Sequence, residues 1–453
     1  MMIDKRRGRL AAAAAVMVTA LGATAACGGG EPAATTGGGS GAPAEKITLT
    51  LQTFGGGTNF GYKAAVEKWN NEHPNVQVKY SNLTPDFENQ YWPQMLNWLQ
   101  AGKGAGDVIG IDEAGMGLAK ARPQFFTDLG QYGLRSRQAD FPAWKWENGV
   151  NTEGKLFALG TDVGGMSVCY RKDLFEKAGL PSDRAKVSEL WPTWDDFIKT
   201  GQDFQKKVPD VKFLDGLNTW FNVALSQETA KNGNVSYYDK QNNLIVETNP
   251  AVKTAFDFAV KVNEAGISAK LRNFQDPWLA GMRKGAFATL GCPGWMLGVV
   301  QGTVTEDGKN PDAGKGQWDV AAVPGGSGNW GGSWLAVPKQ TKHPKEAAEL
   351  ASYLTGPEAQ LLAFKEGGNL PSTIPAQESP ELAGAENEWF SGAPIGEIFG
   401  PSVKTLPPIF LGEKHSQTKA EVENVILGMD DGSIPVSQGW TRFIGEAKKV
   451  ADG

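Results

Sequence analysis

The chain has 453 residues, with 44 basic and 50 acidic side chains and a net charge of −6. Residues 1–26 hold four of the basic and one of the acidic residues, so the remainder has 40 basic and 49 acidic residues, a net charge of −9. An acidic chain without a basic stripe argues against nucleic acid and against electrostatic docking on a membrane. About 400 residues exceed one typical core, so two domains are expected.

The N-terminus has the layout of a processed leader. Four basic residues stand within positions 5–9, residues 10–26 are almost all apolar or small, and Thr24-Ala25-Ala26 leads to Cys27. This resembles a bacterial lipoprotein signal, which predicts a signal peptide over 1–26, lipidation of Cys27 and a flexible Gly/Ser-rich tether over 27–44. A plain secretory signal, a membrane anchor and the choice between Sec and twin-arginine export stay open. Thr24 stands where such signals usually carry Leu.

Strands and helices then alternate through the first third of the chain. Alternating and buried patterns predict strands at 47–54, 76–80 and 107–111, and apolar periodicity predicts helices at 61–72 and 86–100. Pro93 is expected to kink the second helix. This rhythm is typical of a mostly parallel sheet with helices on its faces.

The remainder repeats the rhythm with other lengths. Strands are expected at 166–171, 286–290, 318–323 and 335–337, and helices at 172–178, 194–207, 250–265 and 345–354. Asn249 and Pro250 form an N-cap signal, and Gly266 ends that helix. Residues 239–247 predict a hairpin with an Asn242-Asn243 turn rather than a calcium loop. The C-terminal third is expected to be helical, without strands.

Residues for catalysis or cofactor binding are not grouped in the sequence. Three isolated histidines predict neither a metal site nor a triad, and no phosphate-binding glycine loop or nucleophile elbow is present. We therefore expect no cofactor, no metal and no catalytic residue. Cys169 and Cys292 lie in apolar, strand-like surroundings, where we expect two buried free thiols rather than a disulfide.

Tryptophan is abundant, with 15 residues against 8 Tyr, and many of them flank Gly or Pro. Indole rings stack on the apolar faces of sugar rings, while carboxylates and amides bond to their hydroxyl groups. Trp, Asp, Glu and Asn at strand ends and in loops therefore favour a sugar-binding site without catalysis.

Ordered motifs from residue 47 to the end resemble the extracellular solute-binding proteins (family 1) of carbohydrate ABC transporters. They are Asp162-Val163-Gly164 with Tyr170-Arg171-Lys172-Asp173-Leu174-Phe175, Ala178-Gly179-Leu180-Pro181, Trp191 to Phe197, Gly285 to Ala288 with Gly294-Trp295, Trp330 to Trp334, Gly356 to Gln360, and Gly368 to Ser372. The segments 389–394 and 411–412 are most similar to binders of cellobiose and related β-linked oligosaccharides. Gly165 and Cys292-Pro293 depart from the usual pattern, which affects the detailed sugar contacts.

The resemblance implies an α/β, two-lobe periplasmic-binding-protein-like fold (type II), each lobe a mostly parallel sheet flanked by helices. Lobe one would comprise 45–160 plus 326–370, and lobe two 162–324 plus 371–453. The crossings would lie near Asp162, Pro324 and Asn369, and the ligand would sit in the cleft between the lobes.

The binding residues are predicted from their positions: Asp162 lies at a crossing, Glu113 follows a strand end, and Asn59 and several tryptophans lie in or beside glycine-rich segments. The candidates for carbohydrate binding are Asn59, Glu113, Asp162, Trp220, Trp278, Trp295, Trp330 and Trp334. The expected partners are an oligosaccharide and the permease subunits of an ABC importer. We expect a monomer, lipid-anchored on the extracellular face of the membrane. A secreted glycan-degrading enzyme and a lipoprotein receptor for a non-sugar solute such as a peptide remain the alternatives.

Overall fold

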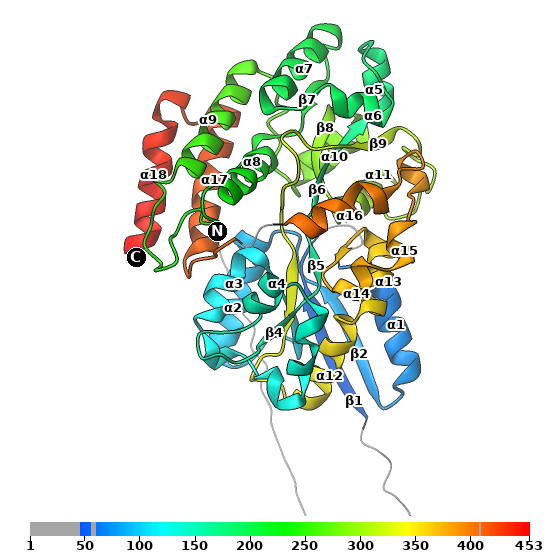
Figure 1. Cartoon of the computed structure of the whole chain (residues 1–453), viewed down its shortest axis with the longest axis vertical. Helices are drawn as coiled ribbons and strands as arrows, with labels where there is room; N and C mark the ends of the chain where they lie inside the picture. The colour runs from blue at the N-terminus through cyan, green and yellow to red at the C-terminus, as the bar shows by residue number, and fades with distance from the viewer. Residues whose placement is uncertain (1–45, 56–59, 407–408) are drawn as a thin grey trace, which may run out of the picture. The chain divides into compact units, whose positions relative to one another are not determined.

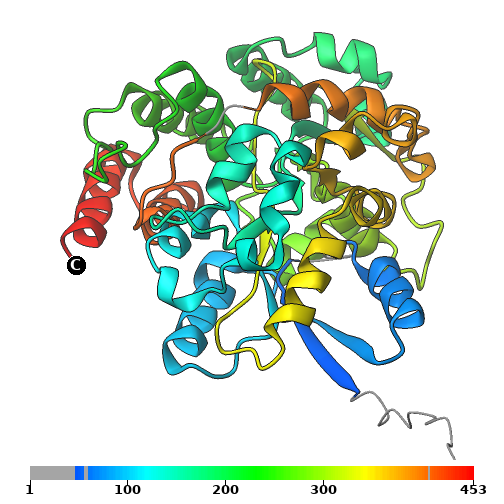
Figure 2. The same cartoon turned by 60° about the horizontal axis from the view of Figure 1, so that its bottom comes forward.

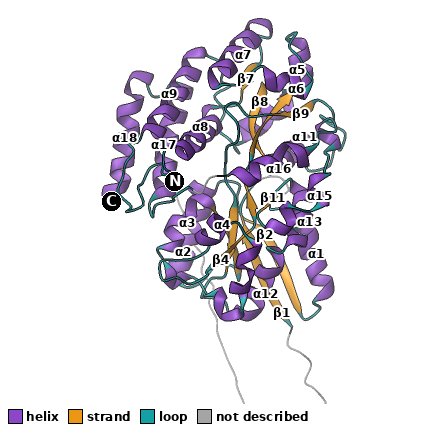
Figure 3. Ribbon diagram, in the orientation of Figure 1, coloured by secondary structure: helices purple, strands orange, loops and turns teal. Residues whose placement is uncertain are grey.

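A computed structural model describes residues 46–55, 60–406 and 409–453 (Figure 1). Two sheets organise them, one in the lower and one in the upper half of the view, and helices flank both (Figures 1 and 3). The sheet in the lower half has the strand order β2-β1-β3-β10-β4. Its strands are β1 (Ile47–Thr53), β2 (Val76–Asn82), β3 (Val108–Asp112), β10 (Ser333–Ala336) and β4 (Ala158–Gly160).

The second sheet has the order β7-β8-β6-β9. It contains β6 (Met166–Arg171), β7 (Lys212–Leu214), β8 (Phe287–Pro293) and β9 (Trp318–Ala321). We call the first sheet with its helices lobe one and the second sheet with its helices lobe two. A two-stranded antiparallel ribbon joins β5 (Asp162–Val163) to β11 (Leu370–Pro371), so Asp162 pairs with Pro371 where the chain passes between the sheets.

Both sheets are mixed rather than mostly parallel. In lobe one, β1 pairs with β2 and β3 in parallel, but β10 runs antiparallel to β3 and β4. In lobe two, β6 is antiparallel to β8 and β9, and only β7 and β8 are parallel. The prediction of mostly parallel sheets is therefore wrong. The strand–helix rhythm identifies the elements, but strand direction depends on where the chain re-enters each sheet.

Helices cover both faces of the lobe-one sheet. One of these helices is α12, which is yellow in Figure 2. The helices on the lobe-one side are α1 (Lys63–Glu72), η1 (Phe87–Tyr91), α2 (Trp92–Ala101), α3 (Glu113–Lys120), η2 (Pro123–Phe125), η3 (Leu129–Tyr132), η4 (Leu134–Asp140), α4 (Ala143–Asn148), α12 (Pro344–Leu354) and α13 (Pro357–Gly367). Pro93 does not kink a continuous helix. Residues 87–91 form a π-helical turn, and Pro93 stands in the first turn of α2, where its missing N–H costs nothing.

Lobe two carries the longest helices together with several short ones. They are α5 (Lys172–Lys177), α6 (Arg184–Glu189), α7 (Trp194–Lys207), α8 (Leu217–Lys231), α9 (Pro250–Ala265), α10 (Asp276–Lys284), α11 (Met296–Val304), α14 (Ile374–Gln377), α15 (Pro380–Ala383), η5 (Glu388–Phe390), α16 (Ile395–Thr405), α17 (His415–Asp431) and α18 (Val436–Asp452). The predicted ends of α9 are confirmed: the Asn249 side chain accepts a hydrogen bond from the Ala251 N–H, and Gly266 ends the helix with a positive φ. The 239–247 segment forms a hairpin, with Asn242 at φ 63°. The short strand β11 corrects the expectation of a strand-free C-terminal third.

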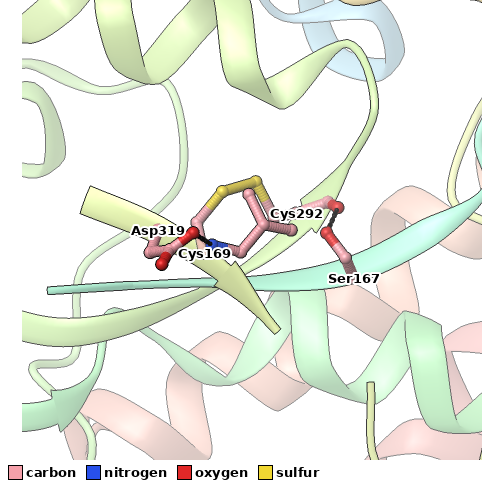
Figure 4. Close-up of a disulfide and its surroundings, with 5 residues drawn as sticks. Ser167, Cys169, Cys292 and Asp319 are labelled. Carbon is pink, nitrogen blue, oxygen red and sulfur yellow. Dashed lines mark hydrogen bonds between the residues drawn. A yellow bond between two sulfur atoms is a disulfide. The ribbon is translucent and has the colours of Figure 1, made fainter. Parts of the chain in front are cut away.

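Cys169 and Cys292 form a disulfide across β6 and β8 (Figure 4). Ser167 is the register partner of Cys292, so Cys169 lies two residues along on the same face, with 5.3 Å between the Cα atoms of the cysteines. The Ser167 hydroxyl donates to the Cys292 carbonyl oxygen at 2.7 Å. The prediction of two free thiols is wrong, because sequence alone did not reveal that these strands are neighbours in this register.

Each lobe has its own apolar core. Side chains of β1, β3 and α12 form that of lobe one, and the two faces of the β6 sheet carry separate clusters because successive strand residues point to opposite faces. Throughout residues 46–55, 60–406 and 409–453, no helix combines the length and the apolarity that crossing a bilayer requires.

Candidate functional site

A cavity of about 210 Å³ lies between the two lobes, which is room for an organic ligand rather than a single water. Lobe one contributes aromatic side chains near β1 and η1 and the carboxyl end of β3. Lobe two contributes one face of α8, the loop before α10, the β8–α11 junction and α17. Ligands of open α/β sheets bind at the carboxyl ends of strands, so this cavity is the candidate site.

Two adjacent acids stand where β3 passes into α3. Asp112 caps the helix, with its Oδ1 accepting from the Ala114 N–H at 2.9 Å. Glu113 Oε2 accepts from Asn329 Nδ2 at 2.7 Å, so Glu113 is a member of the cavity wall rather than a solvated surface acid. Burial raises the pKa of Asp112, and raises that of Glu113 to about 7, against the opposing effect of the Lys145 ammonium.

Asn329 connects the Glu113 carboxylate to lobe two. Its backbone N–H donates to Ser226 Oγ on α8 at 2.8 Å, and its side-chain oxygen accepts from the Gly164 N–H at 3.0 Å. The side-chain amide thereby fixes the orientation of Glu113 at the junction of three segments far apart in the sequence.

Asp162 also lines the cavity, at the start of β5. Its Oδ1 accepts from Thr161 Oγ1 at 2.7 Å and from the Ser333 N–H at 2.9 Å. Burial raises its pKa, partly offset by the nearby ammonium of Lys145, whose Nζ donates to the Asp162 carbonyl oxygen at 2.6 Å. Asp162 therefore both positions the crossing segment and presents a carboxylate to the cavity.

Three aromatic residues form a platform at the cavity: Phe274, Trp295 and Trp330. The Trp295 and Trp330 ring centroids are 5.1 Å apart, and Phe274 lies 6.2 Å and 6.3 Å from them. Trp295 Nε1 donates to the Trp330 carbonyl oxygen at 3.1 Å, which fixes the Trp295 ring to the backbone of Trp330, and both rings are half-buried. Such surfaces suit stacking against an apolar ring face.

The structure corrects three other tryptophan predictions. Trp220, Trp278 and Trp334 are fully buried in cores and none lines the cavity. The indole N–H groups of Trp220 and Trp278 both donate to Asp215, at 3.1 and 2.8 Å. Lys145 Nζ lies 3.3 Å from the centroid of a Trp334 ring, which occupies the face that a sugar would need. The predicted Asn59 and Cys27 lie outside the described residues.

Sequence reasoning missed the wall formed by α8. Its cavity-lining polar residues recur at helical spacing in an apolar run, as Asn218, Asn222, Ser226 and Thr229. This polar stripe was the available signal. Beside it in the same wall, α17 contributes His415, Lys419 and Glu423. Lys419 pairs with Glu423 at 2.9 Å and with Glu88 of lobe one.

Asp215, which does not line the cavity, fixes the loop that carries Phe274. Besides the two indoles, it accepts from Asn273 Nδ2 at 2.9 Å. It is completely buried, and this burial raises its pKa to about 6 despite those donors. Among the described residues, no three His, Cys, Asp or Glu side chains are grouped closely enough to hold a metal ion.

Comparisons with known proteins agree with this architecture. A solved structure described as an extracellular solute-binding protein family 1 is 33% identical, has a TM-score of 0.73 and covers 89% of this chain and 100% of that one. The binding protein associated with an ABC transporter of B. animalis subsp. lactis Bl-04, in complex with beta-1,6-galactobiose, has a TM-score of 0.75 at 17% identity, over 90% and 98% of the two chains. These matches confirm the two-lobe periplasmic-binding-protein-like fold.

Sequence comparison points the same way. The arabinooligosaccharide-binding protein of Bacillus subtilis (strain 168) is 27% identical over 321 residues, which are 68% of this chain and 69% of that protein. The family described as bacterial extracellular solute-binding protein matches residues 64–388, well over half of the chain. The protein is therefore a member of the bacterial extracellular solute-binding protein family.

Proposed function

We propose that this protein captures an oligosaccharide between its lobes and delivers it to the permease of an ABC importer. The observation that carries the proposal is one cavity holding an aromatic platform, at Trp295 and Trp330, together with the carboxylates of Glu113 and Asp162. Stacking surfaces beside hydroxyl acceptors are what a sugar ring requires. The printed names of relatives that bind arabino-oligosaccharides and beta-1,6-galactobiose support the same ligand class.

Capture would proceed by lobe closure. The β5–β11 ribbon and the Gly-rich segment 325–332 lie between the sheets, which supports the predicted crossings near Asp162, Pro324 and Asn369 and the predicted lobe boundaries. A ligand that contacts both walls binds the closed form better than the open form and shifts the population toward closure.

The sugar series is the finer part of the proposal. The sequence resemblance favours cellobiose or another β-linked oligosaccharide, whereas the Bacillus subtilis relative is named for arabino-oligosaccharides. Isothermal titration of the purified full chain against cello-, arabino-, xylo- and malto-oligosaccharides decides between them. Absence of binding to every sugar, with binding of peptides, would reject the sugar proposal.

The main alternative is a glycan-degrading enzyme, because Glu113 is a half-buried acid with a raised pKa in a cleft. The family argues against it, since the relatives are named as binding proteins. We propose that the protein is not an enzyme. Incubating it with the sugar that it binds and with chromogenic glycosides, then assaying for released product, tests this; turnover above that of a Glu113→Gln variant would contradict the proposal.

We further propose that the protein is a monomer, held on the extracellular face of the membrane by lipid on Cys27. The tether would keep a loaded binding protein near its permease. Replacing Cys27 with Ala should release a protein that still binds sugar into the medium. A variant that stays with the membrane fraction would contradict the lipid anchor and leave the binding proposal standing.

A further inference from the structure

The lobe-two wall of the cavity is long. Along α8, Asn218 and Thr229 both line the cavity, and 11 residues at 1.5 Å each place them about 16 Å apart. The loop that bears Phe274 joins the first turn of α8, where Thr219 Oγ1 donates to Asn273 Oδ1 at 3.1 Å. The aromatic platform is therefore linked to one end of this wall, and Thr229 marks the other.

Helix α17 runs antiparallel to α8 along the same wall. Asp430 Oδ2 accepts from the Leu217 N–H at 3.1 Å, and Glu423 Oε1 accepts from Asn222 Nδ2 at 2.6 Å. His415, at the first turn of α17, consequently lies toward the Thr229 end of α8.

At this far end, four cavity-lining side chains are at least nine-tenths buried and each carries a polar atom without a hydrogen-bond partner among the described residues. They are Thr229 (Oγ1), Ser236 (Oγ), Tyr237 (OH) and His415 (Nδ1). An unpaired buried polar group costs about 1–3 kcal/mol. The ring centroids of Tyr237 and His415 are 5.1 Å apart, and the loop that leads from α8 to Ser236 and Tyr237 is bonded to the helix end, where the Asn234 N–H donates to the Thr229 carbonyl oxygen at 3.0 Å. Four unpaired groups at this end point to a ligand that supplies both donors and acceptors, as hydroxyl groups do.

The charges beside these groups are already paired. Lys419 is in ion pairs with both Glu88 and Glu423, which leaves one net negative charge. Both acids raise the pKa of the Tyr237 hydroxyl, behind the larger effect of burial, so they lie within electrostatic range of it. An uncharged group is favoured here over an anionic one.

We propose that Thr229, Ser236, Tyr237 and His415 form a second subsite, which binds an uncharged end ring of a linear oligosaccharide whose other ring stacks on the aromatic platform. This rests on the proposed function and deepens it. The subsite makes the protein selective for chain length, because a monosaccharide is too short to reach both ends of the wall, and it disfavours chains that end in a carboxylate.

Two adjacent tyrosines provide a matched test. Tyr237→Phe removes the unpaired hydroxyl, whereas Tyr238→Phe removes a hydroxyl that is hydrogen-bonded to Thr418 Oγ1 at 2.8 Å and does not line the cavity. Titrations use the full chain with mono-, di- and trisaccharides of the arabino and cello series, and with the aldonic-acid form of the trisaccharide that binds best.

We expect Tyr237→Phe to weaken binding of that trisaccharide about 3- to 10-fold, with an unchanged or higher melting temperature of the free protein. Tyr238→Phe should lower the melting temperature and leave the affinity unchanged. Thr229→Val replaces the hydroxyl by a methyl group and keeps the shape of the side chain. We expect it to change the affinity and the melting temperature as Tyr237→Phe does. The unaltered chain should bind the neutral trisaccharide more tightly than its aldonic-acid form and than the monosaccharide.

Two results overturn the inference in distinguishable ways. If the unaltered chain binds oligosaccharides but Tyr237→Phe and Thr229→Val keep its affinity within twofold, the second subsite is wrong and the proposed function stands. If the unaltered chain binds none of these sugars, both the proposed function and the subsite are wrong.

Discussion

Glu113 combines two roles that its position at the end of β3 imposes. It is close enough to the cavity to accept sugar hydroxyls, and buried enough that its carboxylate is poorly solvated. Asn329 compensates part of that cost through one hydrogen bond. A carboxylate with spare acceptor capacity in such a place is ready for ligand donors, at some expense in the stability of the unliganded protein.

The raised pKa of Glu113 leads to a testable pH dependence. An unfolded Glu loses its proton near pH 4.3, whereas the folded one keeps it up to about pH 7. The unfolded state therefore binds fewer protons in this window, and the stability of the free protein should fall as pH rises, by on the order of 2 kcal/mol between pH 5 and 7. Glu113→Gln should make this part of the urea-unfolding profile less steep; the slope that remains includes the contribution of Asp112, whose pKa is also raised by burial.

The matched control for Glu113 is Glu67→Gln, which also removes one carboxyl group, at an exposed position on α1 that does not line the cavity. Equal slopes for the unaltered chain and Glu113→Gln would show that Glu113 titrates alike in both states, contrary to this prediction.

Asp215 acts on the site indirectly, through the side chains that donate hydrogen bonds to it. Asp215→Ala would leave two indole N–H groups and the Asn273 amide unpaired in a completely buried place, at a cost of roughly 2–4 kcal/mol. Because the loop bearing Phe274 would lose its anchor, oligosaccharide affinity should fall as well. Denaturant unfolding and calorimetric titration measure the two effects; a stability loss with unchanged affinity would mean that the loop is held by other contacts.

At the scale of elements, the disulfide joins two neighbouring strands whose cysteines are 123 residues apart. A cross-link closing a loop of that length stabilises a protein by about 3–5 kcal/mol, chiefly by restricting the unfolded chain. The double variant Cys169→Ala/Cys292→Ala should lose stability of that order in denaturant unfolding. Sugar affinity well below the unfolding temperature should not change, because neither cysteine lines the cavity.

Thiol titration of the unfolded, unreduced chain checks the premise. With the bridge formed, neither Cys169 nor Cys292 has a thiol to react, and lipidation would leave none on Cys27. Reaction of two thiols in the Cys27→Ala chain would show that the bridge is absent.

Helix α17 connects the lobes as well as lining the site. Its apolar face packs in the lobe-two core through Val422, Ile426 and Met429, while Lys419 reaches Glu88 on η1 of lobe one. The neighbouring Gly412 carbonyl oxygen lies so close to Gly117 of α3 that a Cβ there would meet it at 2.0 Å. The start of α17 is therefore in direct contact with lobe one.

For the whole molecule, this contact predicts that lobe closure depends on Lys419. Lys419→Met would leave Glu88 and Glu423 without the cation between them, and their repulsion would favour separation of the lobes. We expect at least tenfold weaker oligosaccharide binding, and a larger radius of gyration by small-angle X-ray scattering at a ligand concentration that saturates the unaltered chain.

Lys253→Met is the control for Lys419, because Lys253 forms an exposed ion pair with Asp257 on α9. Exposed pairs of this kind contribute little to stability. If both variants bind as the unaltered chain does, the Lys419 pairs play no part in closure.

The sequence by itself determined the features that depend on neighbours along the chain. Alternation located β1 and β3, the Asn249-Pro250 signal located the start of α9, and ordered motifs identified the family. Glu113 and Asp162 were predicted because strand ends face ligand clefts in such folds, and Trp295 and Trp330 because they flank glycines; all four line the cavity.

Only the tertiary structure decided which distant residues meet. The disulfide depends on the register of β6 against β8, which brings the two cysteines together. Trp220 and Trp278 can be buried because the carboxylate of Asp215 accepts hydrogen bonds from both indole N–H groups. Helix α8 escaped prediction because 11 of its 15 residues are buried, which leaves no single apolar stripe to detect. Local patterns arise from chemistry within a few residues, whereas these features arise from chain segments far apart in the sequence that packing brings together.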